Sequence, residues 1–590
     1  MRKLFVLLVV SLLMVSFGFA VYSAPVVASS KGVVAAANSY AAEIGAQVLE
    51  MGGNAVDAAV AISLALGVAE PYASGLGGEG YCVITLANGE KYAIDFRSKS
   101  PSATTYEQLE KDFATLSSRV QEDEAGNKYY PIQYNAKGAC VPGVLAGIEA
   151  ALDLAGTMDF SDLIEPSISL AENGMVVNET FAGVVSDAYD KVLNNAPNFL
   201  NEGFAWETGD IFTNPDLAET YKHLQKTGPS DFYNGELAEK IDAFMKEKNG
   251  YITKEDLANY EAIVREPLEG TYRGYDLYVP YPPVSGPQVL AVLNILENYN
   301  LSNFTWDDPL AVHIIQQALV LEDVDRRSFI SDPDFYDLPT EGFVSKEYAK
   351  TRMMNIDLSK AIDPNTYNDY LGNAEDYVDG ESYVDVMLSE AEKAALQTDD
   401  IYEHPSTTHF SVIDQWGNAV AWTQTISSFF GTSEYMDGFF FNNEMYNFSS
   451  NKSSVLALEP NMRPRTTICP TIVQKDGKVR WIIGTPGGGR IVSTIIQLLV
   501  DVIDFNMSID EAVATPKFVG YSSYKDLTIE GGYPESTLAF LSDILGHDVN
   551  EYGYPDLFFG GPNIISVAED GMAVGAGSIR RDGAAAAPEL

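Results

Sequence analysis

Residues 55–68 form a segment in which almost every position is apolar, so a helix built from it has no polar face to turn toward water. Asn54 precedes the segment and is a typical N-cap residue, because its side chain can accept hydrogen bonds from the free N–H groups of a first helical turn. A helix that is apolar all round has to be covered on every side. The segment therefore predicts a fold of several layers with this helix buried among them.

Three pairs of alternating apolar and polar runs are predicted to form β-hairpins. Each pair is joined by a turn dipeptide, namely Asn88-Gly89, Gly417-Asn418 or Asp476-Gly477. The flanking runs are 81–86 with 91–96, 407–414 with 419–425, and 470–474 with 479–483. Helical periodicity is found at residues 40–51, 143–154, 160–173, 288–296 and 490–505, and the middle of the chain, 175–400, is predicted to be helical and irregular. Hairpins between helical stretches predict an α/β fold in which helices cover sheets.

The amino terminus has the pattern of a secretory signal peptide. Arg2 and Lys3 precede an unbroken apolar run over residues 4–17, and Ala20 provides a small residue for a signal peptidase. The run is short for a membrane-spanning helix. We expect residues 1–20 to be removed, which predicts a secreted or periplasmic protein with no membrane span after signal removal.

Charge and cysteine content exclude several kinds of partner and scaffold. The chain carries 37 basic and 83 acidic residues, a formal net charge of −46. Such a surface repels nucleic acid and anionic lipid, so neither is an expected partner. Only three cysteines are present, Cys82, Cys140 and Cys469, each in an apolar or Gly-rich setting. This set does not make a disulfide framework, and buried free thiols are expected.

Side chains for the common hydrolytic and metal-dependent mechanisms are scarce. The chain has five histidines, and no Gly-x-Ser-x-Gly elbow is present to place a nucleophilic serine beside one of them. No His-x-x-x-His or Cys-x-x-Cys spacing predicts a metal site. His409 alternates with Thr408 and Phe410 along a predicted strand, which favours a structural role. We therefore expect neither a metal nor a histidine-based triad.

Thr407 stands at the head of the second predicted hairpin and is a candidate nucleophile. The preceding residues, 376–406, are acidic and poor in apolar periodicity, which is typical of a loosely held connector or of an ordinary surface loop. Cleavage between Ser406 and Thr407 would leave Thr407 with an α-amino group, whose pKa of about 7.7 to 8.0 suits it to act as base for its own hydroxyl. That cleavage is expected to begin with attack of the Thr407 hydroxyl on the Ser406 carbonyl, giving an ester that water opens.

A Gly-rich turn, residues 484–489, leads from the third predicted hairpin into the helix predicted at 490–505. The N-terminus of a helix presents N–H groups that have no partner in the helix, and these groups attract a negative atom. The turn is therefore a candidate site for stabilising negative charge. Another Gly-rich stretch, residues 74–80, does not match a phosphate-binding loop and is explained by a tight crossing of the backbone.

Several motifs, in the same order, resemble the γ-glutamyltransferase (γ-glutamyltranspeptidase) family. The resemblance covers nearly the whole mature chain and rests on Gly52-Gly53-Asn54-Ala55-Val56-Asp57-Ala58-Ala59, Leu76-Gly77-Gly78, Asp95-Phe96-Arg97, Thr407-Thr408-His409, Asn442-Asn443-Glu444-Met445 and Thr485-Pro486-Gly487-Gly488. The family consists of N-terminal-nucleophile hydrolases that are made as one precursor and cleave themselves. The resemblance implies a four-layer αββα sandwich and no cofactor. It also implies a large subunit of residues 21–406 and a small subunit of residues 407–590, both forming one αββα unit.

The resemblance assigns roles to residues of this chain. It implies that Thr407 is nucleophile and, through its amine, general base, and that Thr425 supports the Thr407 hydroxyl. It implies that Gly487 and Gly488 supply N–H donors to the oxyanion, which agrees with the Gly-rich turn before a helix. It implies that Arg97 holds the substrate α-carboxylate, for which a planar guanidinium is suited. From spacing alone, a surface ion pair is the simpler interpretation of Arg97.

The expected substrate pocket departs from the family pattern. Thr466 and Thr467 stand where the family usually has two adjacent serines that contact the α-carboxylate, and Ser427 stands where it usually has an asparagine. Asn447 replaces the aspartate that binds the substrate α-amino group. Losing that charge removes a charge-assisted hydrogen bond of about 1.5–3 kcal/mol, or roughly ten- to a hundredfold in binding. Glu444 is expected to compensate in part.

Three functions are compatible with the sequence. The first is a secreted, self-cleaving γ-glutamyl hydrolase or transferase, which acts on glutathione, γ-glutamyl peptides or poly-γ-glutamate and passes a γ-glutamyl-threonine ester to water or an amine. The second, motivated by Asn447, is a related acylase for side chains without an α-amino group, such as those of glutaryl-cephalosporins. The third is an inactive cell-surface binding protein. Residues 448–463 are shorter than in family members with a lid, which predicts an open cleft that admits bulky or polymeric substrates.

Overall fold

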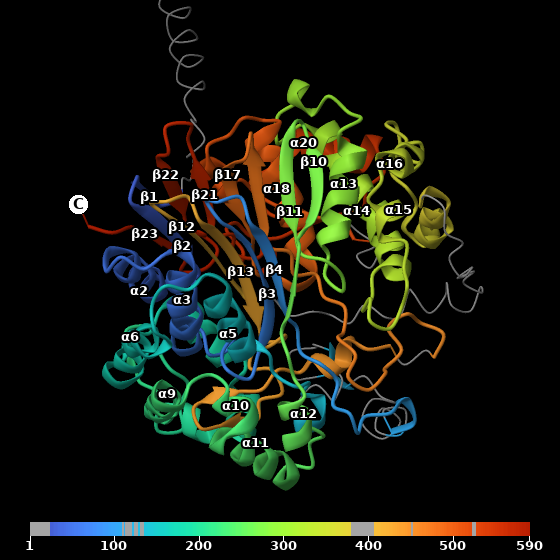
Figure 1. Cartoon of the computed structure of the whole chain (residues 1–590). Coiled ribbons are helices and arrows are strands. Elements are labelled where there is room, and N and C mark those ends of the chain that lie inside the picture. The colour runs from blue at the N-terminus through green and yellow to red at the C-terminus, as the bar shows by residue number, and fades with distance from the viewer. Residues whose placement is uncertain are drawn as a thin grey trace, which may run out of the picture.

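The computed structural model describes residues 24–589 except 109–110, 112–120, 123–127, 130–134, 379–405, 450–451 and 522–526. The predicted signal peptide, residues 1–20, lies outside the described residues, and so does most of the predicted connector 376–406. Figure 1 shows two β-sheets face to face in the middle of the molecule with helices on both outer sides. This is the predicted four-layer αββα arrangement.

The first sheet contains the second predicted hairpin at its centre. Its strand order is β23-β2-β12-β13-β3-β4-β9, and all neighbours are antiparallel. The strands are β23 (Ala584–Ala586), β2 (Gly32–Ala36), β12 (Thr408–Asp414), β13 (Ala419–Thr425), β3 (Glu79–Thr85), β4 (Lys91–Phe96) and β9 (Ile263–Arg265). The predicted hairpins β3–β4 and β12–β13 are both confirmed. Residues of β12, β13 and β3 are buried throughout, because this sheet is covered on both faces.

The second sheet has the order β1-β22-β21-β17-β16-β11-β10 and is also antiparallel. Its strands are β1 (Val26–Ser29), β22 (Ala573–Ala576), β21 (Ile564–Val567), β17 (Lys478–Ile483), β16 (Thr471–Lys475), β11 (Tyr275–Val279) and β10 (Leu268–Tyr272). The third predicted hairpin is β16–β17. Apolar residues of the two sheets meet in one buried cluster, for example Val33 and Val83 from the first sheet with Ile472 and Ile482 from the second.

Helices close the outer faces of both sheets. Against the first sheet pack α2 (Ser39–Glu50), α3 (Ala55–Ala69) and α5 (Val144–Ala155), and against the second α13 (Gly286–Leu296), α14 (Pro309–Phe329) and α18 (Ile491–Ile503). Every residue of α3 is buried, as its all-apolar sequence predicts. Asn54 caps this helix, since its side chain accepts hydrogen bonds from Val56 N at 2.8 Å and Asp57 N at 3.0 Å.

Shorter elements surround the four layers. Next to α3 lies a helical lobe of α6 (Phe160–Asn173), α7 (Glu179–Asp187), α8 (Tyr189–Asn195), α9 (Pro215–Thr227), α10 (Asp231–Asn234), α11 (Glu236–Glu247) and α12 (Lys254–Ala258). On the other side are α15 (Thr340–Phe343), α16 (Lys346–Met353), α19 (Ile509–Ala514) and α20 (Glu535–Ala539), with a small sheet of β18 (Phe518–Val519), β19 (Leu527–Ile529) and β20 (Val549–Glu551). The described residues also form three two-stranded ribbons, β5 (Gln121–Glu122) with β6 (Lys128–Tyr129), β7 (Met175–Val176) with β8 (Ile211–Phe212), and β14 (Tyr435–Met436) with β15 (Phe439–Phe440).

The middle of the chain differs from the prediction of helical and irregular structure. Residues 263–279 contribute β9, β10 and β11 to the two sheets. Strands β9 and β10 lie at sheet edges and are partly exposed, so they lack the continuous apolar runs of central strands. The absence of such an apolar run explains why the sequence pattern did not predict β9 and β10.

All three cysteines are buried and free, as expected. In the part of the chain that the structure describes, no helix is long and apolar enough to cross a membrane.

Candidate active site

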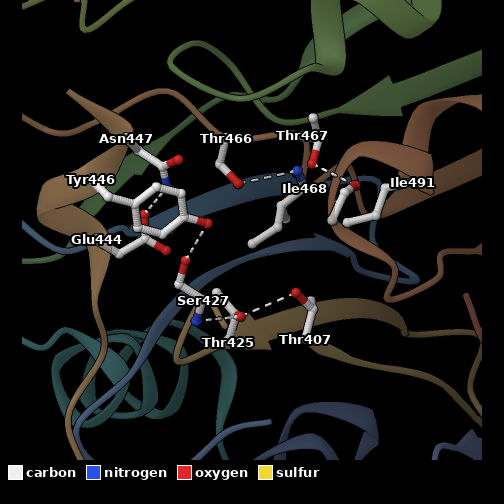
Figure 2. A pocket seen from close by; sticks show the side chains of 11 residues that line it. Thr407, Thr425, Ser427, Glu444, Tyr446, Asn447, Thr466, Thr467, Ile468 and Ile491 are labelled. Carbon is white, nitrogen blue, oxygen red and sulfur yellow. Dashed lines mark hydrogen bonds between the residues drawn. The ribbon is translucent and has the colours of Figure 1, made fainter. Parts of the chain in front are cut away.

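Thr407 and Thr425 lie side by side at the same end of β12 and β13, because the hairpin register pairs Thr408 with Gln424. The Thr407 hydroxyl donates a hydrogen bond of 3.1 Å to the Thr425 hydroxyl oxygen (Figure 2). The same oxygen accepts a hydrogen bond of 2.8 Å from Ser427 N. Thr425 thus orients the hydroxyl of the candidate nucleophile, and the backbone N–H of Ser427 in turn holds Thr425 in place.

The backbone at Thr407 is strained. Its φ angle is +81°, a region that β-branched residues rarely adopt, and such a conformation costs about 1–3 kcal/mol. The φ angle is defined by the peptide bond to Ser406, so breaking that bond removes the constraint. Strain of this kind occurs where the surrounding structure holds the backbone in place.

Arg581 holds both carbonyl groups next to the Ser406–Thr407 bond. Its Nη1 donates a hydrogen bond of 2.8 Å to Thr407 O, and its Nη2 lies 3.5 Å from Ser406 O. The buried carboxyl of Glu70 is a nearby counter-charge: burial raises its pKa, and Arg581 opposes that rise. Sequence reasoning missed Arg581, since no local pattern connects it with Thr407.

A pocket of about 300 Å³, measured together with its mouth, opens above these residues. Eight of the predicted site residues line it, together with three that were not predicted, Tyr446, Ile468 and Ile491. The eight are Thr407, Thr425, Ser427, Glu444, Asn447, Thr466, Thr467 and Gly488. Figure 2 shows the labelled side chains around the pocket, which come from the start of β12, from β13 and the loop after it, from the turn around Glu444, from the loop before β16 and from the start of α18. The sequence could have indicated Tyr446, because this aromatic residue directly precedes Asn447, which was predicted to line the site.

Arg97 lies outside the lining of this pocket. Its side chain has 0% exposure and forms ion pairs with Glu79 and with Glu444, where the Nη2–Oε2 distance is 2.5 Å. Its Nε donates a hydrogen bond of 2.9 Å to Pro464 O. The interpretation as a surface ion pair is wrong, because the pair is buried. The implied contact of Arg97 with a substrate carboxylate stays a prediction.

The turn around Glu444 presents mainly uncharged groups to the pocket. The Asn447 side-chain amide donates a hydrogen bond to Glu444 Oε2, the oxygen that also binds Arg97. The Ser427 hydroxyl lies 3.2 Å from the Tyr446 hydroxyl. Glu444 is therefore bound by two side chains of the protein. The hydroxyl groups of Ser427 and Tyr446 together form the neighbouring part of the pocket wall.

The Gly-rich turn between β17 and α18 has a geometry suited to binding an anion. Gly487 and Gly488 have φ angles of +140° and +53°, and Gly487 O accepts a hydrogen bond of 3.1 Å from Arg490 N. Among the described residues, neither the Gly487 nor the Gly488 N–H donates a hydrogen bond. Free N–H groups at the start of a helix stabilise negative charge. Gly488 lines the pocket, whereas Gly487 does not.

His409 has the structural role that the strand pattern predicts. Its Nδ1 lies 2.8 Å from Thr423 Oγ1, and its Nε2 lies 3.1 Å from Ser411 Oγ. Burial lowers the pKa of its imidazole to about 3, so the ring is neutral near pH 7. No cluster of three or more potential metal ligands is found in the described ranges.

The family model described as Gamma-glutamyltranspeptidase matches residues 41–588. The glutathione hydrolase proenzyme of Escherichia coli strain K12 is 35% identical over 532 residues, which cover 87% of this chain and 85% of that protein. An acylase proenzyme of Pseudomonas sp. strain SE83 is 32% identical and covers 94% of this chain and 93% of that protein. The crystal structure of a cephalosporin acylase from Bacillus halodurans superposes with a TM-score of 0.82, 25% identity and coverage of 96% and 97%.

Proposed function

This chain belongs to the gamma-glutamyltranspeptidase family of enzymes, and we propose that it is a self-cleaving hydrolase or transferase whose nucleophile is Thr407. The acyl group is proposed to be γ-glutamyl, taken from glutathione, γ-glutamyl peptides or poly-γ-glutamate. The observation that carries the proposal is the hydrogen bond from the Thr407 hydroxyl to Thr425, at a strained backbone position whose flanking carbonyls both face Arg581. Membership in a family of enzymes argues against the third function considered above, that of an inactive cell-surface binding protein.

The first reaction is the proposed maturation. The Thr407 Oγ attacks the carbonyl carbon of Ser406, the C–N bond between the two residues breaks, and the hydroxyl proton passes to the departing nitrogen. Water then adds to the resulting ester, which leaves a carboxylate on Ser406 and restores the Thr407 hydroxyl. Relief of the strained φ angle at Thr407 favours the first step. The proenzyme names of the relatives support a precursor, and we propose residues 21–406 and 407–590 as its two subunits, after removal of residues 1–20 as an export signal.

The second reaction is acyl transfer. The free amine of Thr407 takes the hydroxyl proton while Oγ attacks the substrate amide, and the leaving amine receives that proton. The oxyanion of this step is proposed to bind the unpaired N–H groups of Gly487 and Gly488. A γ-glutamyl ester on Thr407 results, and water or a second amine then takes the acyl group. No cofactor takes part in this scheme.

A related acylase, which removes glutaryl-type side chains, is the second candidate. Position 447 is a neutral asparagine, and Glu444 is bonded to Arg97 and Asn447. The pocket therefore has no acidic side chain free of protein partners to bind a substrate ammonium group, among the residues that line it. Acylase relatives support this candidate as well. We propose that Arg97, Ser427, Glu444, Asn447 and Thr466 determine which acyl group is accepted.

One experiment tests the nucleophile and the substrate together. The purified protein is run on a denaturing gel, and the lighter band is sequenced from its amino terminus, where Thr407 is expected as first residue. Thr407→Ala is expected to stay as one uncleaved, inactive band, while the matched control Thr408→Ala is cleaved. A lighter band that starts elsewhere, or an active Thr407→Ala protein, would contradict the mechanism. The mature enzyme is then given γ-glutamyl and glutaryl anilides, and faster release from the glutaryl compound would favour the second candidate.

A further inference from the structure

Thr467 makes a contact that its expected role does not explain. Its hydroxyl donates a hydrogen bond of 2.8 Å to the carbonyl oxygen of Gly488 (Figure 2), and the residue is only 4% exposed. Gly488 belongs to the turn whose free N–H groups are proposed to bind the oxyanion. The loop before β16 and the turn before α18 are thus joined by one side-chain hydrogen bond inside the pocket.

A threonine hydroxyl has one proton to donate. While that proton is bonded to Gly488 O, the Thr467 oxygen offers a carboxylate only lone pairs, and a carboxylate is itself an acceptor. Thr466 is different, because its Oγ1 accepts a long hydrogen bond of 3.4 Å from Ile468 N and keeps its proton available. In the described part of the chain, the Thr466 hydroxyl donates to no protein group. Of the two adjacent hydroxyls, only that of Thr466 is free to donate to an acyl-chain carboxylate.

We propose that Thr467 is a positioning residue for the turn at residues 484–489, called the oxyanion turn below. Of the two threonines, only Thr466 is proposed to bind the carboxylate of the acyl chain. The inference rests on the proposed function, since it presupposes an oxyanion at Gly487 and Gly488. The turn is held from one side by Arg490, whose N bonds to Gly487 O at 3.1 Å and whose Nε bonds to Phe558 O at 3.0 Å. On the pocket side, the hydrogen bond from Thr467 to Gly488 O holds the turn. Gly487 and Gly488 have no side chains, so their neighbours fix the turn: Thr485 Oγ1 donates a hydrogen bond of 2.7 Å to Pro486 O, and Ile491 N donates one to Gly488 O.

The geometry explains how one hydroxyl affects catalysis without touching the substrate. An oxyanion donor is effective only when its N–H points to the position that the developing charge will occupy. The Thr467 bond fixes the peptide that follows Gly488 and thereby limits rotation of Gly488 itself. Removing the bond leaves the donors present but less well aligned. The expected consequence is a slower chemical step at unchanged affinity for the substrate.

The test compares matched variants of the two threonines in the mature enzyme. Thr467→Val keeps the side-chain shape and removes the hydroxyl, and we expect kcat to fall about tenfold or more, with KM changed less than twofold. Thr467→Ser keeps the hydroxyl and is expected to restore kcat. Thr466→Val is expected to raise KM instead. Thr467→Ala is measured alongside as a second hydroxyl-free variant, in case the valine is not accommodated, and the gel-determined fraction of cleaved protein sets the enzyme concentration.

The acyl group gives a further comparison. The loss of kcat in Thr467→Val is expected to be equal for γ-glutamyl and glutaryl anilides, because the oxyanion turn does not contact the distal part of either. A raised KM with unchanged kcat in Thr467→Val, or a lowered kcat with unchanged KM in Thr466→Val, would overturn the inference. If the wild type releases neither anilide, or lacks Thr407 as an amino terminus, it is the proposed function that fails. Normal wild-type turnover with no loss in the hydroxyl-free variants refutes only the role of Thr467.

Discussion

Arg581 Nη1 donates a hydrogen bond of 2.8 Å to the carbonyl oxygen of Thr407, although the two residues are 174 positions apart in the chain. Its second terminal nitrogen lies 3.5 Å from Ser406 O, so one buried guanidinium faces the oxygens on both sides of the proposed cleavage point. Attack on the Ser406 carbonyl places negative charge on that oxygen. A fixed positive charge close to that oxygen stabilises such an oxyanion.

We predict that Arg581→Lys slows self-cleavage about tenfold or more, because an ammonium group cannot span both carbonyls. The measurement is the half-time of conversion of the precursor into two bands. Arg580→Lys is the matched control, since Arg580 is equally buried but binds Glu530, at an Nη2–Oε2 distance of 2.6 Å. Its cleavage rate is expected to stay near that of the wild type. Equal half-times for Arg581→Lys and the wild type would contradict the role of Arg581.

The second prediction concerns the hydroxyl that accepts from the nucleophile. Thr425→Val removes the oxygen to which Thr407 Oγ1 and Ser427 N both donate. We expect kcat of the mature enzyme to fall about a hundredfold, because a reacting atom displaced by 1 Å costs about that much. Thr425→Ser keeps the oxygen and is expected to retain most of the activity. A Thr425→Val enzyme with wild-type kcat would show that Thr407 needs no such support.

Much of the fold could be predicted from local sequence, and the reasons are physical. The helix α3 and the hairpin β12–β13 follow from apolar periodicity and turn dipeptides, which act over a few residues. The edge strand β10 was missed because it is half exposed and lacks a continuous apolar run.

The site shows the same limit. Motifs led to the residues that line the pocket, but contacts between distant parts of the chain were not readable from any pattern. Arg97 meets Glu444 across 347 positions, and Arg581 meets Thr407 across 174. Whether an arginine binds substrate or a buried carboxylate depends on such tertiary contacts, which spacing does not encode.

The third prediction is a loss of stability in acid. Burial lowers the pKa of His547 to about 3, and His313 Nδ1, 2.8 Å from His547 Nε2, belongs to a ring whose pKa burial also lowers. In the unfolded chain a histidine has a pKa of about 6.5, so the unfolded state binds more protons below that pH. Stabilisation by a buried neutral ring is therefore complete above pH 6.5 and falls as the pH drops toward 3. At pH 5 the loss from His547 is about 2 kcal/mol.

The measurement is the thermal midpoint of the wild type and of His547→Gln between pH 7 and pH 5. The variant is expected to be less stable at pH 7 but to lose less on acidification, because one proton-binding group of the unfolded chain is gone. The carboxylates contribute equally to the pH dependence of the thermal midpoint in both proteins, so their contribution cancels when the two curves are subtracted. Parallel curves would mean that His547 does not titrate between the two states.

The fourth prediction concerns the choice of acyl group. Asn447→Asp places a carboxylate where the structure has an amide bonded to Glu444 Oε2. A substrate ammonium group bound there would gain a charge-assisted hydrogen bond of about 1.5–3 kcal/mol, so the ratio of kcat/KM for γ-glutamyl over glutaryl anilide is expected to rise roughly ten- to a hundredfold. The new carboxylate lies beside Glu444, and repulsion between them reduces the gain unless the ammonium group is present. Asn447→Ala is the control, since it removes the amide without adding charge and is expected to leave the ratio nearly unchanged. If Asn447→Asp leaves the ratio unchanged as well, the side chain at position 447 does not bind the substrate α-amino group. The hydroxyls of Ser427 and Tyr446 are then the next groups to replace, because they form the neighbouring wall of the pocket.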